Sequence, residues 1–163
     1  MQDIPPPISL DTPMVLMKPQ QECSTAEVYK RFQLNKASTI DPLHLLEEIS
    51  TNGISQNVCI NDLEPPAFEV LPSLKKLKQQ VLRANRGQYY AVSMSGSGST
   101  IVGIGDPEPP KFIYDDNEYS DICISDAYFL TRKDNEWYQA PDSVGVTSGR
   151  ERNSTQVVQG AFR

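Results

Sequence analysis

One stretch of the chain, from Ala91 to Gly105, constrains the possible folds more than any other. Two short runs, 89–94 and 100–104, are rich in the β-branched and aromatic residues that are typical of strands. Between them lies a loop built only from serine and glycine, namely Ser95, Gly96, Ser97, Gly98 and Ser99. We therefore expect two strands joined by a loop whose backbone a ligand can approach closely.

From its residues alone, the serine–glycine loop allows two interpretations. Glycine tolerates positive φ, and the serine hydroxyls together with the N–H groups of the turn can bind an anion. A mobile turn without a ligand is equally consistent with this composition. The loop is not a P-loop, because no lysine follows its glycines. It is not a dinucleotide-binding fingerprint either, because the required glycine spacing and the following helix are missing.

Composition narrows the class of protein. The 163 residues suffice for one domain, but only 38% are apolar and thirteen are proline, so part of the chain is expected to be extended. A net charge of −6 argues against nucleic-acid binding, and no apolar run is long enough to span a membrane. Cys23, Cys59 and Cys123 are expected to be free, mostly buried thiols in a reducing compartment. The single histidine, His44, nearly excludes His-based zinc sites and Ser/His or Cys/His catalysis, and is expected on a helix surface or in packing.

The chain begins with a predicted strand and a capped helix. Residues 14–17 form a short apolar run that predicts a strand covered on both faces. The sequence Ser-Thr-Ala-Glu at 24–27 is a capping box, which predicts a helix that extends to Phe32. Thr25 and Tyr29 lie one turn apart on the same face of this helix.

Two further helices are predicted. The second begins at Asp41 and Pro42 and ends near Gly53, because these residues favour the N-cap, the first turn and the C-cap. Its inward-facing residues are expected to be Leu43, Leu46 and Ile49. The third spans residues 67–85, with a kink expected at Pro72. Its apolar stripe is expected to be Leu71, Leu74, Leu77, Val81 and Leu82. Its opposite, solvated face is expected to carry Lys75, Lys76, Lys78, Arg83 and Arg86.

The C-terminal part predicts a loop, a strand and a tail. Residues 106–121 are acidic and interrupted by proline, which indicates a surface loop with a short strand at 112–114. Residues 122–130 predict the last strand. The order of elements favours an α+β domain in which helices cover one face of a mainly antiparallel sheet. We expect an extended lead-in at 1–13, the domain at 14–138 and a disordered tail at 139–163.

Four stretches resemble a known family. Residues 92–100 (V-S-M-S-G-S-G-S-T) resemble the third conserved motif of the GHMP small-molecule kinases. Residues 16–19 (L-M-K-P), 23–29 (C-S-T-A-E-V-Y) and 61–68 (N-D-L-E-P-P-A-F) narrow the resemblance. Together they are similar to the C-terminal half of the 4-diphosphocytidyl-2-C-methyl-D-erythritol kinases, above all those of plant plastids. The likeness covers nearly the whole chain up to Tyr138, and the N-D-L-E and S-T-A-E-V-Y stretches are its most specific parts.

The resemblance implies a fold and a reaction. These kinases use ATP and Mg²⁺ to phosphorylate a hydroxyl of 4-diphosphocytidyl-2-C-methyl-D-erythritol, a step of the non-mevalonate route to isoprenoid precursors. It implies a ferredoxin-like α+β domain, with the active site in a cleft between it and an N-terminal domain. That N-terminal domain supplies the catalytic lysine and aspartate and a G-G-G-S-S loop for the ATP phosphates. The G-G-G-S-S sequence does not occur in this chain, so we expect the chain alone to lack kinase activity.

The resemblance also implies roles for residues of this chain. Tyr29 takes the place of an aromatic side chain that stacks on the cytosine of the substrate, and Thr25 is expected to hydrogen-bond near that base or its diphosphate. The loop 95–99 is expected to approach the centre of phosphoryl transfer and to brace the nucleotide loop. The residues alone leave an alternative for Tyr29, namely packing on the sheet. No catalytic residue and no metal ligand is predicted in this chain.

Two departures from the family leave other interpretations open. Residues 106–121 stand where bacterial relatives place a helix, and nothing matches beyond residue 138. The resemblance implies a plastid location, although residues 1–13 are acidic and proline-rich, unlike a transit peptide. The alternative function is a non-catalytic remnant of the fold that binds cytidine or another partner.

Overall fold

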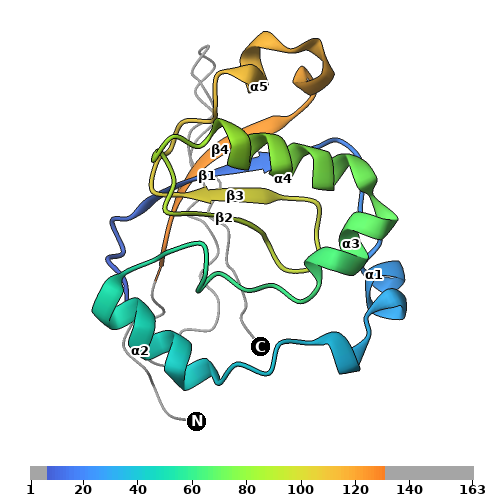
Figure 1. Ribbon diagram of the computed structural model, residues 1–163. Helices are drawn as coiled ribbons and strands as arrows, with labels where there is room; N and C mark the ends of the chain where they lie inside the picture. The colour runs from blue at the N-terminus through green and yellow to red at the C-terminus, as the bar shows by residue number, and fades with distance from the viewer. Residues whose placement is uncertain (1–6, 131–163) are drawn as a thin grey trace, which may run out of the picture.

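The computed structural model describes residues 7–130, which form a four-stranded antiparallel sheet with helices packed on one face (Figure 1). The strands are β1 (Pro13–Lys18), β2 (Ala91–Met94), β3 (Ile101–Ile104) and β4 (Cys123–Tyr128), in the spatial order β2-β3-β1-β4. The helices are α1 (Thr25–Arg31), α2 (Pro42–Asn52), α3 (Glu64–Val70), α4 (Pro72–Ala84) and α5 (Phe112–Asp115), with 3₁₀ turns at Leu34–Lys36 and Asn117–Tyr119. The predicted α+β class is confirmed, and the arrangement is that of a ferredoxin-like domain.

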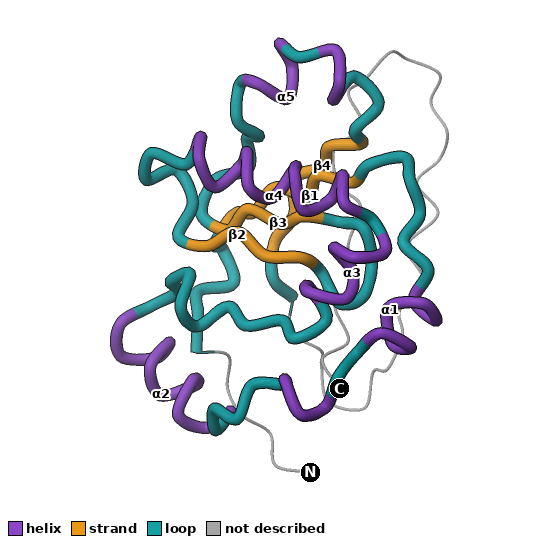
Figure 2. Tube along the Cα trace, turned by 45° about the vertical axis from the view of Figure 1, so that its right-hand side comes forward, coloured by secondary structure: helices purple, strands orange, loops and turns teal. Residues whose placement is uncertain are grey.

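The main core lies between α4 and one face of the sheet (Figures 1 and 2). Side chains alternate between the two faces of a strand, so the face toward α4 carries every second residue of the three strands next to it. These core residues of the sheet are Val15, Met17, Val92, Met94 and Ile101. The residues that α4 contributes are Leu74, Leu77 and Val81, none more than 1% exposed.

A glycine in β3 makes room for an aromatic ring on the sheet. A Cβ atom added at Gly103 would lie 2.8 Å from Cε1 of Tyr89. Tyr89 is only 3% exposed, and its hydroxyl donates a hydrogen bond to the carbonyl of Glu108. Gly103 is therefore needed for close packing, and burial raises the pKa of the Tyr89 phenol.

The third predicted helix is two helices. α3 ends at Val70 and α4 begins at Pro72, because Leu71 between them has φ −132° and ψ 83°, outside the helical region. A residue before proline is disfavoured in the α conformation, so the kink expected at Pro72 is a complete break. The expected burial of Leu82 is also wrong, since this side chain is 38% exposed.

The acidic segment before β4 is helical and partly buried. The strand predicted at 112–114 is wrong, because these residues begin α5. A three-residue apolar run is too short to distinguish the period of a helix from that of a strand. In the structure, Ile113 and Tyr119 are part of the core beside α4. The rings of Phe112 and Tyr119 meet edge to face with centroids 5.3 Å apart, and the Tyr119 hydroxyl bonds to Gln80 of α4. Short helical turns thus occupy the place before the last strand.

The ends of α2 agree with the prediction, whereas its burial does not. The Asp41 carboxylate accepts a hydrogen bond from the Leu43 N–H at 2.9 Å, and Gly53 ends the helix with φ 80°. No residue of α2 is buried, and Leu43, expected to face inward, is 60% exposed. Leu46 and Ile49 are only partly buried. Figures 1 and 2 show α2 in a segment of the chain that extends away from the sheet.

The cysteines, the single histidine and the chain ends lie outside the core of the domain or outside the described residues. The three cysteines are free, but they are not mostly buried, because Cys23 and Cys59 are half-buried and Cys123 is exposed. His44 is exposed on the surface of α2. Among residues 7–130, no helix combines the length and apolarity needed to cross a membrane. Residues 1–6 of the expected lead-in and the expected tail at 139–163 lie outside the described residues.

Candidate functional site

The serine–glycine loop joins β2 to β3 as a tight hairpin turn. The Ser95 N–H donates to the Thr100 carbonyl at 2.9 Å, and the Gly98 N–H donates to the Ser95 carbonyl at 3.2 Å. Gly96 has φ 56°, in the left-handed region that favours glycine, but Gly98 is not in that region. A Cβ at Gly98 would make an ordinary contact of 3.6 Å with the Ser95 carbonyl, so only Gly96 needs a glycine for its conformation.

Thr25 lies against this loop, although the two are far apart in the sequence. The hydroxyls of Thr25 and Ser97 are 3.2 Å apart and share a hydrogen bond. Thr25 is in the first turn of α1, where the Ser24 hydroxyl accepts from the Glu27 N–H at 3.4 Å, as the capping box predicts. The structure therefore brings together two parts of the predicted site.

Tyr29 lies one turn farther along α1 and is 58% exposed. The neighbouring Val28 provides the contact of this helix with the core, since it is fully buried. Packing of the Tyr29 ring on the sheet, the alternative that the sequence left open, does not occur. The ring is available to a ligand, and its stacking on cytosine stays a prediction.

Asn61 also holds the loop, through its side-chain amide. Its side-chain Nδ2 donates to the Met94 carbonyl at 2.9 Å and to the Gly96 carbonyl at 2.8 Å. Its Oδ1 accepts from the Leu63 N–H at 3.0 Å, so both ends of the amide are engaged. In the sequence this asparagine stands out only as part of the N-D-L-E stretch, which does not predict its contact with the loop.

Glu64 continues this support along the outer edge of β2. Its Oε1 accepts from the Met94 N–H at 2.8 Å, and its Oε2 lies 2.5 Å from the Lys78 ammonium of α4. The two charged side chains are only 14% and 12% exposed, which shields the pair from solvent. β2 is thereby tied to α4 at the point where the strand enters the loop.

Gln56 closes the same edge one step earlier. Its side-chain amide accepts from the Val92 N–H at 2.9 Å and donates to the Val92 carbonyl at 3.0 Å, as a neighbouring strand would. An edge strand such as β2 presents unpaired backbone N–H and C=O groups, and here side chains form hydrogen bonds with them. No motif in the sequence marks Gln56, because its role depends on a strand more than thirty residues away.

The basic face of α4 is not uniformly solvated. Lys78 pairs with Glu64 inside the site, whereas Lys76 pairs with Glu118 at 2.6 Å on the surface. The expected solvated face is therefore wrong at Lys78, which is half-buried and pairs with Glu64 of α3. Close by, burial raises the pKa of the Cys59 thiol, so the thiol stays protonated near neutral pH.

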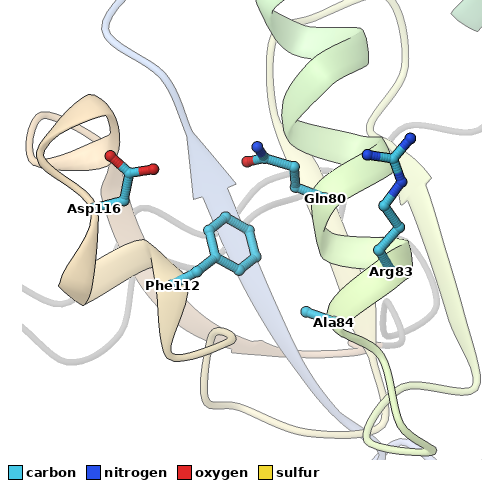
Figure 3. A pocket seen from close by; sticks show the side chains of 5 residues that line it. All are labelled: Gln80, Arg83, Ala84, Phe112 and Asp116. Atoms are coloured by element: carbon cyan, nitrogen blue, oxygen red, sulfur yellow. The ribbon is translucent and has the colours of Figure 1, made fainter.

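A shallow hollow lies elsewhere, between the end of α4 and α5 (Figure 3). Its lining residues are Gln80, Arg83, Ala84, Phe112 and Asp116. None of them belongs to the serine–glycine loop or to α1. Within residues 7–130, no group of three His, Cys, Asp or Glu side chains is placed to hold a metal ion.

The chain is similar to several named kinases. It is 70% identical over 148 residues to "4-diphosphocytidyl-2-C-methyl-D-erythritol kinase, chloroplastic/chromoplastic" of Solanum lycopersicum, which covers 91% of this chain and 37% of the relative. It is 61% identical over 147 residues to the chloroplastic kinase of the same name from Arabidopsis thaliana, covering 90% of this chain and 38% of the relative. A crystal structure of 4-(cytidine 5'-diphospho)-2C-methyl-D-erythritol kinase aligns with 61% of this chain and 37% of its own, at 27% identity and a TM-score of 0.47.

These relatives are longer than this chain, which spans about 37% of the length of the tomato kinase. Residues 42–119 match the family described as "GHMP kinases C terminal". The matched segment contains α2 to α5, the hairpin with its serine–glycine loop, and the three side chains that support it. Residues 42–119 of this chain thus form a GHMP kinase C-terminal domain.

Proposed function

We propose that this chain is the substrate-side, C-terminal part of a kinase that transfers a phosphoryl group from ATP to 4-diphosphocytidyl-2-C-methyl-D-erythritol. The observation that carries the proposal is the 70% identity to the tomato kinase, which extends over 91% of this chain. The reaction then belongs to the non-mevalonate route to isoprenoids. The chloroplastic names of the relatives support a plastid location for the complete enzyme.

The work of the reaction divides between this domain and an N-terminal kinase domain. Phosphoryl transfer depends on positioning and on charges around the phosphates, which a lysine, an aspartate and Mg²⁺ supply in such kinases. We assign Mg²⁺ and most ATP contacts to that N-terminal domain, as the resemblance to these kinases implies. This chain alone is therefore inactive, and the intact cleft between the two domains is the catalytic unit.

Two elements of this chain face the substrate in the proposal. Tyr29 stacks on the cytosine, and its 58% exposure supports a role in binding rather than in the core. The loop 95–99 faces the phosphates with its N–H groups and hydroxyls, and Thr25 links the loop to the helix that carries Tyr29. The loop and the helix that carries Tyr29 are thus in contact through one pair of hydroxyls.

A chimaera tests the proposal. This chain replaces the corresponding C-terminal part of the tomato kinase, and phosphorylation of 4-diphosphocytidyl-2-C-methyl-D-erythritol by ATP is measured. We expect turnover by the chimaera and none by the 163-residue chain alone. A folded chimaera without turnover would contradict the kinase assignment. If the chain alone bound the cytidine substrate while that chimaera stayed inactive, the alternative of a non-catalytic cytidine-binding remnant would replace it.

Tyr29→Ala in the chimaera tests the stacking role. We expect KM for the cytidine substrate to rise with little change in KM for ATP, because the ring contacts the base and not the transferred group. The loss in kcat/KM should be about ten- to a hundredfold, which corresponds to a stacking energy of about 1–3 kcal/mol. Tyr29→Phe keeps the aromatic face and should behave like the unchanged chimaera. Tyr90→Ala is the matched control, since Tyr90 is 59% exposed and precedes β2 at the end away from the loop.

A further inference from the structure

We infer that Asn61 is a positioning residue, which fixes the direction in which the serine–glycine loop presents its N–H groups to a phosphate. The phosphate as ligand rests on the proposed function, whereas the geometry of the loop does not. Asn61 touches neither nucleotide nor substrate in this inference. It acts through the backbone of the loop.

The contacts of Asn61 leave its side chain no second orientation. Nδ2 donates to two carbonyls, those of Met94 and Gly96, at 2.9 and 2.8 Å. Oδ1 accepts from the Leu63 N–H at 3.0 Å, at the start of α3. Rotation of the amide by half a turn would place an oxygen against both carbonyls and lose all three hydrogen bonds. The amide therefore connects the loop rigidly to the segment that begins α3.

Holding a carbonyl also sets the direction of the next N–H. In a planar trans peptide the C=O and the following N–H point in opposite directions, and residues 7–130 contain no cis peptide. The Met94 carbonyl points to Asn61, so the Ser95 N–H points inward, where it donates to the Thr100 carbonyl at 2.9 Å. The same rule applied to the Gly96 carbonyl turns the Ser97 N–H away from Asn61.

The Ser97 N–H is one of the groups that this arrangement leaves for a ligand. Within the described part of the chain, neither it nor the Gly96 N–H donates to another protein group. The Ser97 hydroxyl is held at 3.2 Å by Thr25. The loop is thus held by Thr25 through a hydroxyl and by Asn61 through two carbonyls, with free N–H donors that suit an anion.

Activity of the chimaera gives the first test. Asn61→Ala removes both carbonyl contacts, and Asn61→Asp keeps the shape but loses the donor. We expect each variant to lower kcat on the order of ten- to a hundredfold, because small displacements of positioning groups have effects of this size. KM for the cytidine substrate should stay unchanged, since Tyr29 is on another element. A rise in that KM with unchanged kcat would overturn the inference.

Asp62 provides the matched control. It lies in the same stretch and its carboxylate accepts a backbone hydrogen bond, but from the Ser38 N–H at 3.0 Å and not from the loop. Asp62→Asn should leave kcat within about twofold of the chimaera. An equal fall in kcat for both positions would mean that the whole segment, and not the loop contact of Asn61, matters for turnover, and this would overturn the inference.

Amide hydrogen exchange in the 163-residue chain tests the geometry without any activity. Asn61→Ala should speed exchange of the Ser95 N–H by about tenfold, because the loop loses the two hydrogen bonds that hold its peptides. The Val92 N–H, which Gln56 holds, should exchange at its original rate. Unchanged exchange at Ser95 would overturn the positioning role even in an active chimaera. Faster exchange with an inactive chimaera would retain the loop geometry and reject only the proposed function.

Discussion

Helices α2 and α4 differ in what stabilises them: α2 has well-defined ends but no buried residue, whereas α4 lacks a side-chain cap but packs against the sheet. α2 has an aspartate N-cap with a 2.9 Å hydrogen bond, a proline in its first turn and a glycine at its end. α4 has no side-chain cap, yet Leu74, Leu77 and Val81 are buried against the sheet. Caps fix where a helix begins and ends, but most helical stability comes from packing of an apolar face. We therefore expect α4 to support the whole domain and α2 to support only itself.

The largest expected effect separates the two helices by burial. Leu77→Ala should lower the free energy of unfolding by about 2–5 kcal/mol, because a cavity opens where the side chain was 1% exposed. Leu43→Ala in α2 removes a side chain that is 60% exposed and should change the free energy of unfolding by less than about 0.5 kcal/mol. Chemical denaturation of the 163-residue chain measures both. Similar losses for both variants would show that α2 packs against the domain in solution.

A second comparison uses two lysines of α4. Lys78→Met leaves the Glu64 carboxylate without its cation in a partly buried place and should destabilise the chain by about 1–3 kcal/mol. Lys76→Met breaks a pair whose side chains are 51% and 47% exposed, and should cost about 0–1 kcal/mol. Added salt should weaken the Lys76 contribution more than that of Lys78. Thermal unfolding of both variants at two salt concentrations measures the loss of stability and its dependence on salt. Equal losses of stability for the two variants would show that shielding of the Glu64–Lys78 pair from solvent has no energetic importance.

The smallest expected effect on global stability concerns the cap of α2. Asp41→Ala removes the hydrogen bond to the Leu43 N–H and should weaken the helix by about 1 kcal/mol. Because no residue of α2 is buried, this loss should appear as faster amide exchange within Pro42–Asn52, with Tm nearly unchanged. A fall in Tm comparable to that of Leu77→Ala would contradict the independence of α2.

Local chemistry explains which features the sequence could predict. The boundaries of α2 follow from Asp41, Pro42 and Gly53, because each acts on its own backbone. Burial of Leu43 could not be read from its spacing, since periodicity predicts an apolar face but not whether another element lies opposite it. The break at Leu71 was readable in principle from the proline that follows it.

The candidate site divides in the same way. The serine–glycine hairpin was predicted because its composition is local, and the resemblance supplied Thr25 and Tyr29. Asn61, Glu64 and Gln56 were missed because each bonds to a strand that lies at least thirty residues further along the chain. The N-D-L-E stretch was the one signal that could have identified Asn61 and Glu64. Gln56 had none.

The position of β1 in the sheet has a consequence for how the chain acquires its fold during synthesis. Among the strands of residues 7–130, β1 is synthesised first, but its two partners, β3 and β4, begin only at Ile101 and Cys123. Pairing between such distant segments folds slowly, since a long loop must close before any contact forms. Until the segment through Tyr128 has left the ribosome, the apolar residues of β1 lack one of their neighbours. A nascent chain interrupted before that point would expose this strand to chaperones or to aggregation.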